Sequence, residues 1–178
     1  MTAKAPIGLF YGSSTCYTEM AGEKIQQAFS QTPGAPAVDT FNITDTPIVE
    51  AGFYDFIIFG IPTWDYGELQ EDWEEIWDDI DELDLTGKKV AVYGMGDQEG
   101  YPEWFVDAMG YLYHKARKCG AEMVGHWPNQ GYEFEASKAL TTDQSHFVGL
   151  ALDDETQFEQ SDDRIRQWVA QLHHEFGL

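Results

Sequence analysis

Short apolar runs alternate with segments of helical periodicity along this chain, and that alternation constrains its fold more than any other feature. Apolar runs of strand length occur at residues 7–11, 38–43, 56–61, 90–95, 123–125 and 147–152. Apolar residues spaced three or four apart predict helices between most of these runs. Strands that alternate with helices predict a doubly wound α/β fold, with a parallel five-stranded sheet covered by helices on both faces.

The boundaries of the predicted elements come from residues that stop or start regular structure. Pro62 is expected to end the third strand. A helix is expected to carry its apolar stripe on Trp73, Ile76, Trp77 and Ile80. Pro102 is well placed as the first residue of the next helix, and Ser161 can cap the last one. The stretch 127–146 has no clear periodicity, so it is predicted to be an insertion or a functional loop.

The balance of charge excludes several classes of function. The 178 residues include 32 acids and 10 bases, a formal net charge of −22. Nucleic-acid binding requires a basic surface, and anionic membranes also repel such a chain. The charge favours basic protein partners, although a generally acidic surface, as in adaptation to salt, would give the same composition. No apolar run is long enough to span a membrane and no signal peptide is visible, so a cytoplasmic protein is expected.

Two cysteines and five histidines give no sign of a disulfide scaffold or a metal site. Cys16 and Cys119 are too few for a scaffold, and free thiols agree with a cytoplasmic location. The histidines show no ligand spacing together with other donors. No metal is therefore expected.

Three loops follow strands of the predicted sheet and should lie together at its carboxyl edge, where ligands bind in this class of fold. The first loop, residues 12–19, carries four Ser and Thr hydroxyls at a predicted helix N-terminus. Plain capping needs only one hydroxyl, whereas free N–H groups and the helix dipole suit an anion. The loop has no Walker or dinucleotide motif and no cation, so it predicts a site for a monophosphate ester.

The second loop, residues 62–67, and the third loop, residues 94–101, each contribute an aromatic residue outside the core stripes. Trp64 precedes the stripe that starts at Trp73, and Tyr101 precedes the stripe that starts at Phe105. Each ring alone could be a loop anchor. Two rings beside a phosphate site favour a planar ligand held by stacking, worth roughly 1–3 kcal/mol per face by analogy with nucleic-acid bases. A phosphate and a flat ring in this fold suggest FMN.

In these loops and their flanking segments, the sequence resembles the flavodoxins. The matching segments are GLFYGSST…TE, GIPTWDYGELQEDW, YGMGDQEGY and FVGLALDDE, which begin at Gly8, Gly60, Tyr93 and Phe147. They are spread over nearly the whole chain, so residues 1–178 are expected to form one FMN-binding domain. The stretch 127–146 is similar to the insertion in the fifth strand of long-chain flavodoxins, and SSTCYTEM is similar to the second flavodoxins of some bacteria. The implied strand order is 2-1-3-4-5.

The resemblance also implies which residues hold FMN. The phosphate would be cradled by Ser13, Ser14, Thr15, Cys16, Tyr17 and Thr18. The flavin would be stacked and bordered by Pro62, Thr63, Trp64, Asp65, Tyr66, Gly67, Gly94, Met95, Gly96, Asp97 and Tyr101. Within this set Trp64 and Tyr101 would stack on opposite faces, the backbone of 65–67 would border N5, and an acid within 153–155 could lie near the ribityl chain. The family usually has Gly in place of Cys16, so a positive φ there would cost roughly 1 kcal/mol.

The implied function is low-potential one-electron transfer without substrate turnover, from a reductase or photosystem-type donor to acceptor enzymes. A backbone flip near Asp65 could stabilise the semiquinone. Residues 65–84 hold 11 acids and no base. Most of these acids are expected to face solvent, and the part near the flavin is predicted to dock a basic partner such as an NADPH–flavodoxin reductase. A monomer is expected. The alternatives are a flavin-dependent NAD(P)H reductase of related fold and a regulatory module without redox chemistry.

Overall fold

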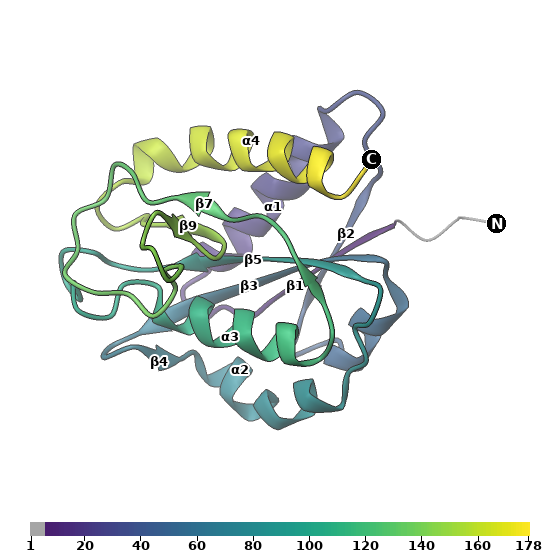
Figure 1. Ribbon diagram of the computed structural model, residues 1–178, viewed down its shortest axis with the longest axis horizontal. Coiled ribbons are helices and arrows are strands. Elements are labelled where there is room, and N and C mark those ends of the chain that lie inside the picture. Colours follow the sequence, from purple (N-terminus) through teal and green to yellow (C-terminus); the bar gives the residue numbers. More distant parts are fainter. Residues whose placement is uncertain (1–5) are drawn as a thin grey trace.

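A parallel β-sheet forms the centre of this computed structural model, which describes residues 6–178 (Figure 1). Four strands follow one another in the order β2-β1-β3-β5. Their bounds are Val38–Asn42, Ile7–Tyr11, Phe56–Trp64 and Lys89–Met95. All five residues of β1 are buried, because helices cover both faces of the sheet. The apolar runs therefore became strands close to the predicted bounds.

The fifth strand is divided into two short pieces that both pair with β5. β6 (Glu122–Met123) pairs in parallel with the start of β5, and β9 (Leu150–Leu152) pairs in parallel with its end. The chain between the two pieces forms the long insertion. The predicted order 2-1-3-4-5, with an insertion in the fifth strand, is confirmed.

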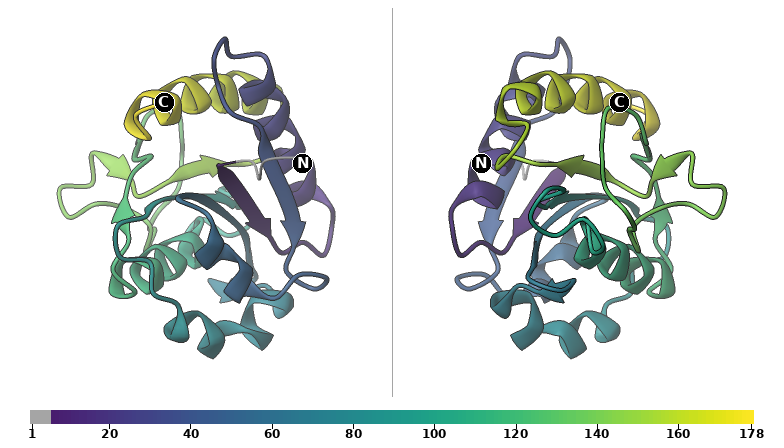
Figure 2. Two further views of the ribbon diagram at one scale, coloured as in Figure 1. Left: turned by 90° about the vertical axis from the view of Figure 1, so that its right-hand side faces the viewer. Right: turned by 90° about the vertical axis from the view of Figure 1, so that its left-hand side faces the viewer.

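Two layers of helices enclose the sheet (Figures 1 and 2). α1 (Tyr17–Ser30) and α4 (Phe158–Glu175) lie together on one face. The other face is covered by α2 (Glu71–Glu75), the 3₁₀ helix η2 (Trp77–Glu82) and α3 (Asp107–Lys118). A further 3₁₀ helix, η1 (Ile48–Phe53), connects β2 with β3.

The insertion is fixed to the rest of the molecule by buried polar contacts. It contains an antiparallel pair of short strands, β7 (Trp127–Pro128) and β8 (His146–Phe147). Tyr132 donates its O–H to the carbonyl of Ala151 in β9 at 2.6 Å, and the Arg164 guanidinium of α4 lies 4.1 Å from the centre of the Tyr132 ring. Burial raises the pKa of Tyr132 to about 12. These contacts make the insertion part of the core.

Two predicted helix starts are wrong, and in both cases tertiary contacts override the local signal. α3 begins at Asp107 and not at Pro102, because the Phe105 N–H donates to the Ala136 carbonyl and Val106 adopts a φ of 50°. α4 begins before Ser161, whose hydroxyl donates to Asp154 from within the helix.

The region after β3 also differs from its prediction. β3 continues through Pro62 to Trp64, because the strand remains paired with β5 as far as Pro62↔Met95. It then pairs antiparallel with β4 (Glu68–Leu69). The expected helix is divided at Ile76 into α2 and η2, and of its stripe Ile76 and Trp77 are only partly buried. Within residues 6–178, no helix combines the length and apolar character needed to cross a membrane.

Candidate functional site

The three loop segments of the sequence analysis, which include the last residues of β3 and β5, line one cavity of about 240 Å³ at the carboxyl edge of the sheet. This position is the expected ligand site of a doubly wound fold. The wall residues come from all three loops and from the segment after β9: Thr15, Tyr17, Pro62, Thr63, Trp64, Asp65, Met95, Gly96, Asp97, Tyr101, Asp154 and Glu155.

The first loop presents an uncapped helix N-terminus. Cys16 is the residue before α1 and adopts the left-handed conformation, with a φ of 68°. No side chain caps the helix, so the N–H groups of its first turn remain available to an external acceptor. The Ser13 hydroxyl is buried and has no hydrogen-bond partner among the described residues. An anion at this end would satisfy both the hydroxyl and the helix dipole.

The two loop aromatics lie on the same cavity. The indole N–H of Trp64 is buried and has no partner within the described part of the chain. Tyr101 is 37% exposed, and its O–H donates to an Asp65 carboxylate oxygen at 3.4 Å. The negative charge of Asp65 raises the pKa of Tyr101. Tyr66 is more exposed and packs edge-on against Trp104, which leaves it outside the cavity wall.

Gly67 is the point where the second loop passes close to α3. Its φ is 83°, and a Cβ there would lie 2.8 Å from a carboxylate oxygen of Asp107. The other oxygen of Asp107 accepts the Lys138 N–H of the insertion at 2.7 Å. Burial raises the pKa of Asp107. α3 also donates its Ala108 N–H to the Thr63 hydroxyl at the end of β3, so α3 approaches the chain on both sides of Trp64.

The cavity wall includes most of the residues that the sequence predicted, but it leaves others outside. Ser13, Ser14, Cys16 and Thr18 belong to the first loop without lining the cavity. Tyr66, Gly67 and Gly94 also lie outside the wall.

Sequence reasoning missed two buried side chains that hold these loops in place. Gln98 is 3% exposed and donates two hydrogen bonds, from its backbone and its amide, to the buried carboxylate of Asp153. Gln70 is 1% exposed and donates to the Ser14 hydroxyl. Neither residue has a local signal, because each acts on a loop far away in the sequence. Of the acidic residues within 153–155, Asp154 and Glu155 are the ones on the cavity wall.

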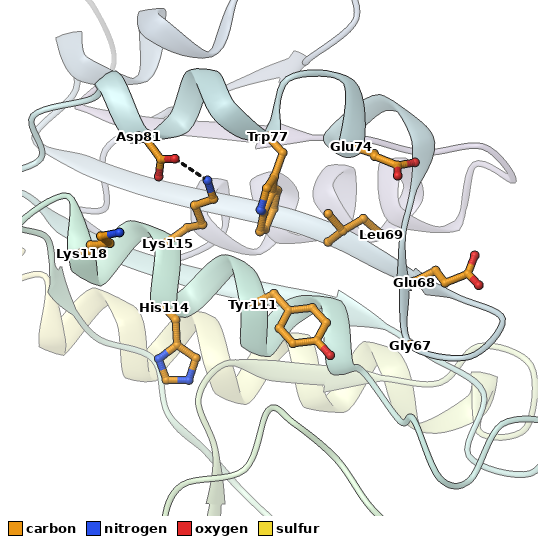
Figure 3. Close-up of a pocket in the computed structure, with 10 residues that line it drawn as sticks. All are labelled: Gly67, Glu68, Leu69, Glu74, Trp77, Asp81, Tyr111, His114, Lys115 and Lys118. Atoms are coloured by element: carbon orange, nitrogen blue, oxygen red, sulfur yellow. Dashed lines mark hydrogen bonds and ion pairs between the residues drawn. The ribbon is translucent and has the colours of Figure 1, made fainter.

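A larger groove, of about 630 Å³, lies between α3 and the α2–η2 segment (Figure 3). The Lys115 ammonium group crosses it to Asp81 at 2.7 Å and lies 5.2 Å from the centre of the Trp77 ring. Of the predicted site residues only Gly67 lines this groove. None of its wall residues carries a buried polar atom without a partner. The cavity at the loops is therefore the candidate site. No group of His, Cys, Asp and Glu among residues 6–178 could hold a metal ion.

A family model described as flavodoxin matches residues 9–168. The chain belongs to the flavodoxin family. It is 52% identical to flavodoxin 2 of Escherichia coli over 171 residues, which cover 96% of each chain. It is 48% identical to a flavodoxin of Synechococcus elongatus, over 98% of this chain and 99% of the relative.

Solved structures agree with this assignment. The flavodoxin of Fusobacterium nucleatum bound to flavin mononucleotide superposes with a TM-score of 0.86 at 28% identity, and the match covers 97% of this chain and 99% of that one. The resemblance to long-chain flavodoxins is thus confirmed for the family and the fold. Flavodoxins are electron carriers and not enzymes, so the site has to be understood as one that binds and adjusts a cofactor.

Proposed function

We propose that this flavodoxin binds FMN without a covalent bond in the cavity at the three loops, and that it acts as a monomeric, cytoplasmic one-electron carrier. The observation that carries the proposal is the pair of unpartnered buried polar atoms, Ser13 Oγ and Trp64 Nε1, beside an uncapped helix N-terminus. Buried polar groups normally have partners, so these two donors fit a ligand that carries hydrogen-bond acceptors, as a phosphate does. The FMN-bound relative of the same fold supports this choice of ligand.

The residues present fit the separate parts of FMN. The phosphate would be held by the first loop through Ser13, Ser14, Thr15, Cys16, Tyr17 and Thr18. Trp64 and Tyr101 would stack on the flavin, and the backbone of 65–67 would border its N5 edge. Gly96 and Asp97 would border the pyrimidine edge, with Pro62, Thr63 and Met95 on the cavity wall and Gly94 behind it. FMN supplies the reversible one-electron chemistry, and the chain binds and orients it.

The acids around the cavity would lower the reduction potential, because the reduced flavin is an anion. Asp65, Asp97, Asp154 and Glu155 lie on the cavity wall. One carboxylate at ~12 Å in an effective dielectric of ~40 contributes ~0.7 kcal/mol, which is about 30 mV for one electron. Several such carboxylates together would therefore give a low potential.

The acids of residues 65–84 that lie near the cavity would steer a basic redox protein, such as an NADPH-dependent reductase, to the exposed edge of the flavin. Residues 65–84 carry 11 acids and no base. We expect the reduced protein to react with hexaammineruthenium(III), a cation, at a rate that falls steeply with added salt. With ferricyanide, an anion, the rate should rise with salt. Equal salt dependence for the two oxidants would contradict steering by charge.

Absorption spectroscopy tests the cofactor and the carrier function together. The purified protein, or apoprotein mixed with FMN, should show a protein-bound flavin spectrum. Stepwise reduction should proceed in two separate one-electron steps. In stopped-flow mixing, NADPH alone should reduce the flavin very slowly, because a carrier depends on a reductase. A chain that cannot be loaded with FMN, or that NADPH reduces rapidly, would contradict the proposal.

A further inference from the structure

Gln70, a short distance after the second loop, contacts the first loop through its buried side chain. It lies between β4 and α2 and is 1% exposed. Its amide nitrogen donates to the Ser14 hydroxyl oxygen at 3.0 Å and to a carboxylate oxygen of Asp72 at 2.7 Å. Both hydrogens of the amide nitrogen are therefore used, and one of them reaches the loop at the N-terminus of α1.

The carboxylate of Asp72 determines which way the Gln70 amide points. An ionised carboxylate accepts hydrogen bonds and cannot donate them, so it selects the NH₂ end of the amide. The same NH₂ group then donates to Ser14, whose oxygen has to accept. Ser14 is exposed, and the hydrogen bond that its hydroxyl makes within residues 6–178 is the one that it accepts from Gln70. This O–H is left free to donate to a further acceptor outside the chain.

The carbonyl end of the Gln70 amide shows that this orientation has a cost. Its Oε1 atom is buried and has no partner among the described residues, and a Cβ on Gly12 would lie only 2.5 Å from it. A buried acceptor without a partner destabilises the fold. Turning the amide over would direct Oε1 at the Asp72 carboxylate and would remove both donor contacts. The structure keeps the orientation that presents a donor to Ser14.

We propose that Gln70 is a positioning residue for the phosphate of the cofactor, acting through Ser14. Its N–H occupies a lone pair of the Ser14 hydroxyl and turns the O–H of Ser14 toward the phosphate. A chain of donors, from Gln70 to Ser14 to the anion, polarises each hydrogen bond in the same direction. The inference rests on the proposed FMN function, in which the first loop holds the phosphate.

The proposal predicts that Gln70 affects the binding of one flavin and not of another. Gln70 should matter for FMN, which has a phosphate, and not for riboflavin, which has the same ring and ribityl chain without one. A residue that only supported the fold of the second loop would affect both flavins equally, because the flavin ring is common to them.

Titration of the apoprotein with FMN and with riboflavin, monitored by flavin fluorescence, tests this prediction. In Gln70→Met, which keeps the length of the side chain but has no donor, we expect FMN affinity to fall about fivefold. Riboflavin affinity should change by less than about twofold. Inorganic phosphate, used as a competitor of FMN, should also compete less well with the variant.

A double-mutant cycle tests whether the effect passes through Ser14. Ser14→Ala should weaken FMN binding, and adding Gln70→Met to it should have little further effect. Gln171→Met is a matched control, since the Gln171 amide donates at 2.7 Å to the backbone carbonyl of His126, a residue outside the cofactor cavity. Its ratio of FMN to riboflavin affinity should equal that of the wild type. Circular dichroism confirms that each variant is folded, and Gln70→Leu provides a second, uncharged variant without a donor.

The possible results distinguish a failure of the proposed role of Gln70 from a failure of the proposed function. Equal losses for FMN and riboflavin, additive effects in the cycle, or unchanged FMN binding in Gln70→Met would each overturn the role of Gln70. If the wild-type apoprotein binds neither flavin, the proposed function itself fails. If it binds FMN no better than riboflavin, the phosphate site fails while the ring site stands.

Discussion

At the scale of single residues, Cys16 carries backbone strain that glycine would not. Its φ of 68° lies in the left-handed region, and its side chain makes no capping hydrogen bond. We expect Cys16→Gly to raise the free energy of unfolding of the apoprotein by about 0.5–1 kcal/mol, because the relief of left-handed strain exceeds the extra entropy of glycine in the unfolded chain. Urea unfolding measures the difference.

Cys16→Ala is the control for this substitution. Alanine removes the thiol but keeps a Cβ, so the strain remains and no gain in stability is expected. A gain of the same size in both variants would show that the thiol, and not the conformation, is the source of the effect.

Tyr11 makes the stability of the apoprotein depend on pH in the alkaline range. Burial and the hydrogen bond that it donates to Glu19 at 3.1 Å raise the pKa of Tyr11 to about 12, from 10 in the unfolded chain. The folded state favours the protonated phenol, so the stabilisation is complete below pH 10 and is lost as the pH rises toward 12. The stability difference between wild type and Tyr11→Phe should therefore shrink between pH 10 and pH 12 in urea unfolding. A difference that is constant with pH would contradict this assignment.

Site residues differ in how well the sequence predicts them. Trp64 and Tyr101 are apparent because they are aromatic, lie in segments predicted as loops and fall outside the apolar stripes. Ser13 is apparent because hydroxyls gather at a helix start. Gln70 and Gln98 have no such signal, since each is one polar residue in a polar segment and its role depends on a partner 55 or 56 positions away. Contacts of that range follow only from the folded structure.

At the scale of elements, the packing of β5 against β3 depends on the absence of a side chain at Gly60. A Cβ there would lie 2.2 Å from the ring of Tyr93, whose O–H reaches across to the Thr18 carbonyl in the first turn of α1 at 2.8 Å. Gly60→Ala should lower the free energy of unfolding by about 1–3 kcal/mol through overpacking. Because Tyr93 holds the start of α1, FMN affinity should fall too.

The cause can be checked by a second substitution and a control. Tyr93→Leu removes the atoms that meet the added methyl group, so the double variant should lose less stability than the two single effects predict by addition. Gly52→Ala is the matched control, because a Cβ on Gly52 has no atom within 4 Å and should leave stability within about 0.5 kcal/mol. Strictly additive losses would show that the two residues do not clash.

Elements built on apolar periodicity were predictable, and their ends were not. The strands and the apolar faces of α1, α3 and α4 follow from patterns a few residues long. The start of α3 is set by the insertion, which holds Phe105 through Ala136, and local sequence does not contain that contact. The insertion was predicted from its lack of periodicity and from the resemblance to long-chain flavodoxins, but neither gives its internal structure. Its order comes from buried contacts with Arg164 and Ala151.

At the scale of the whole molecule, charge repulsion should reduce stability in dilute buffer. The chain has 32 acids against 10 bases, and the described residues form three ion pairs. Repulsion between exposed charges therefore outweighs attraction. Salt screens both interactions, and at 0.1 M salt the screening length is about 10 Å.

Raising sodium chloride from about 0.01 to 0.5 M should consequently stabilise the apoprotein by on the order of 1 kcal/mol, or about 2–4 °C in the thermal midpoint. The double variant Glu75→Gln/Glu82→Gln, which removes two exposed acids from the α2–η2 segment, should melt higher at low salt and respond less to added salt. An equal response in wild type and variant would point to a general effect of the salt on burial. A midpoint that falls with salt would mean that the three ion pairs outweigh the repulsion.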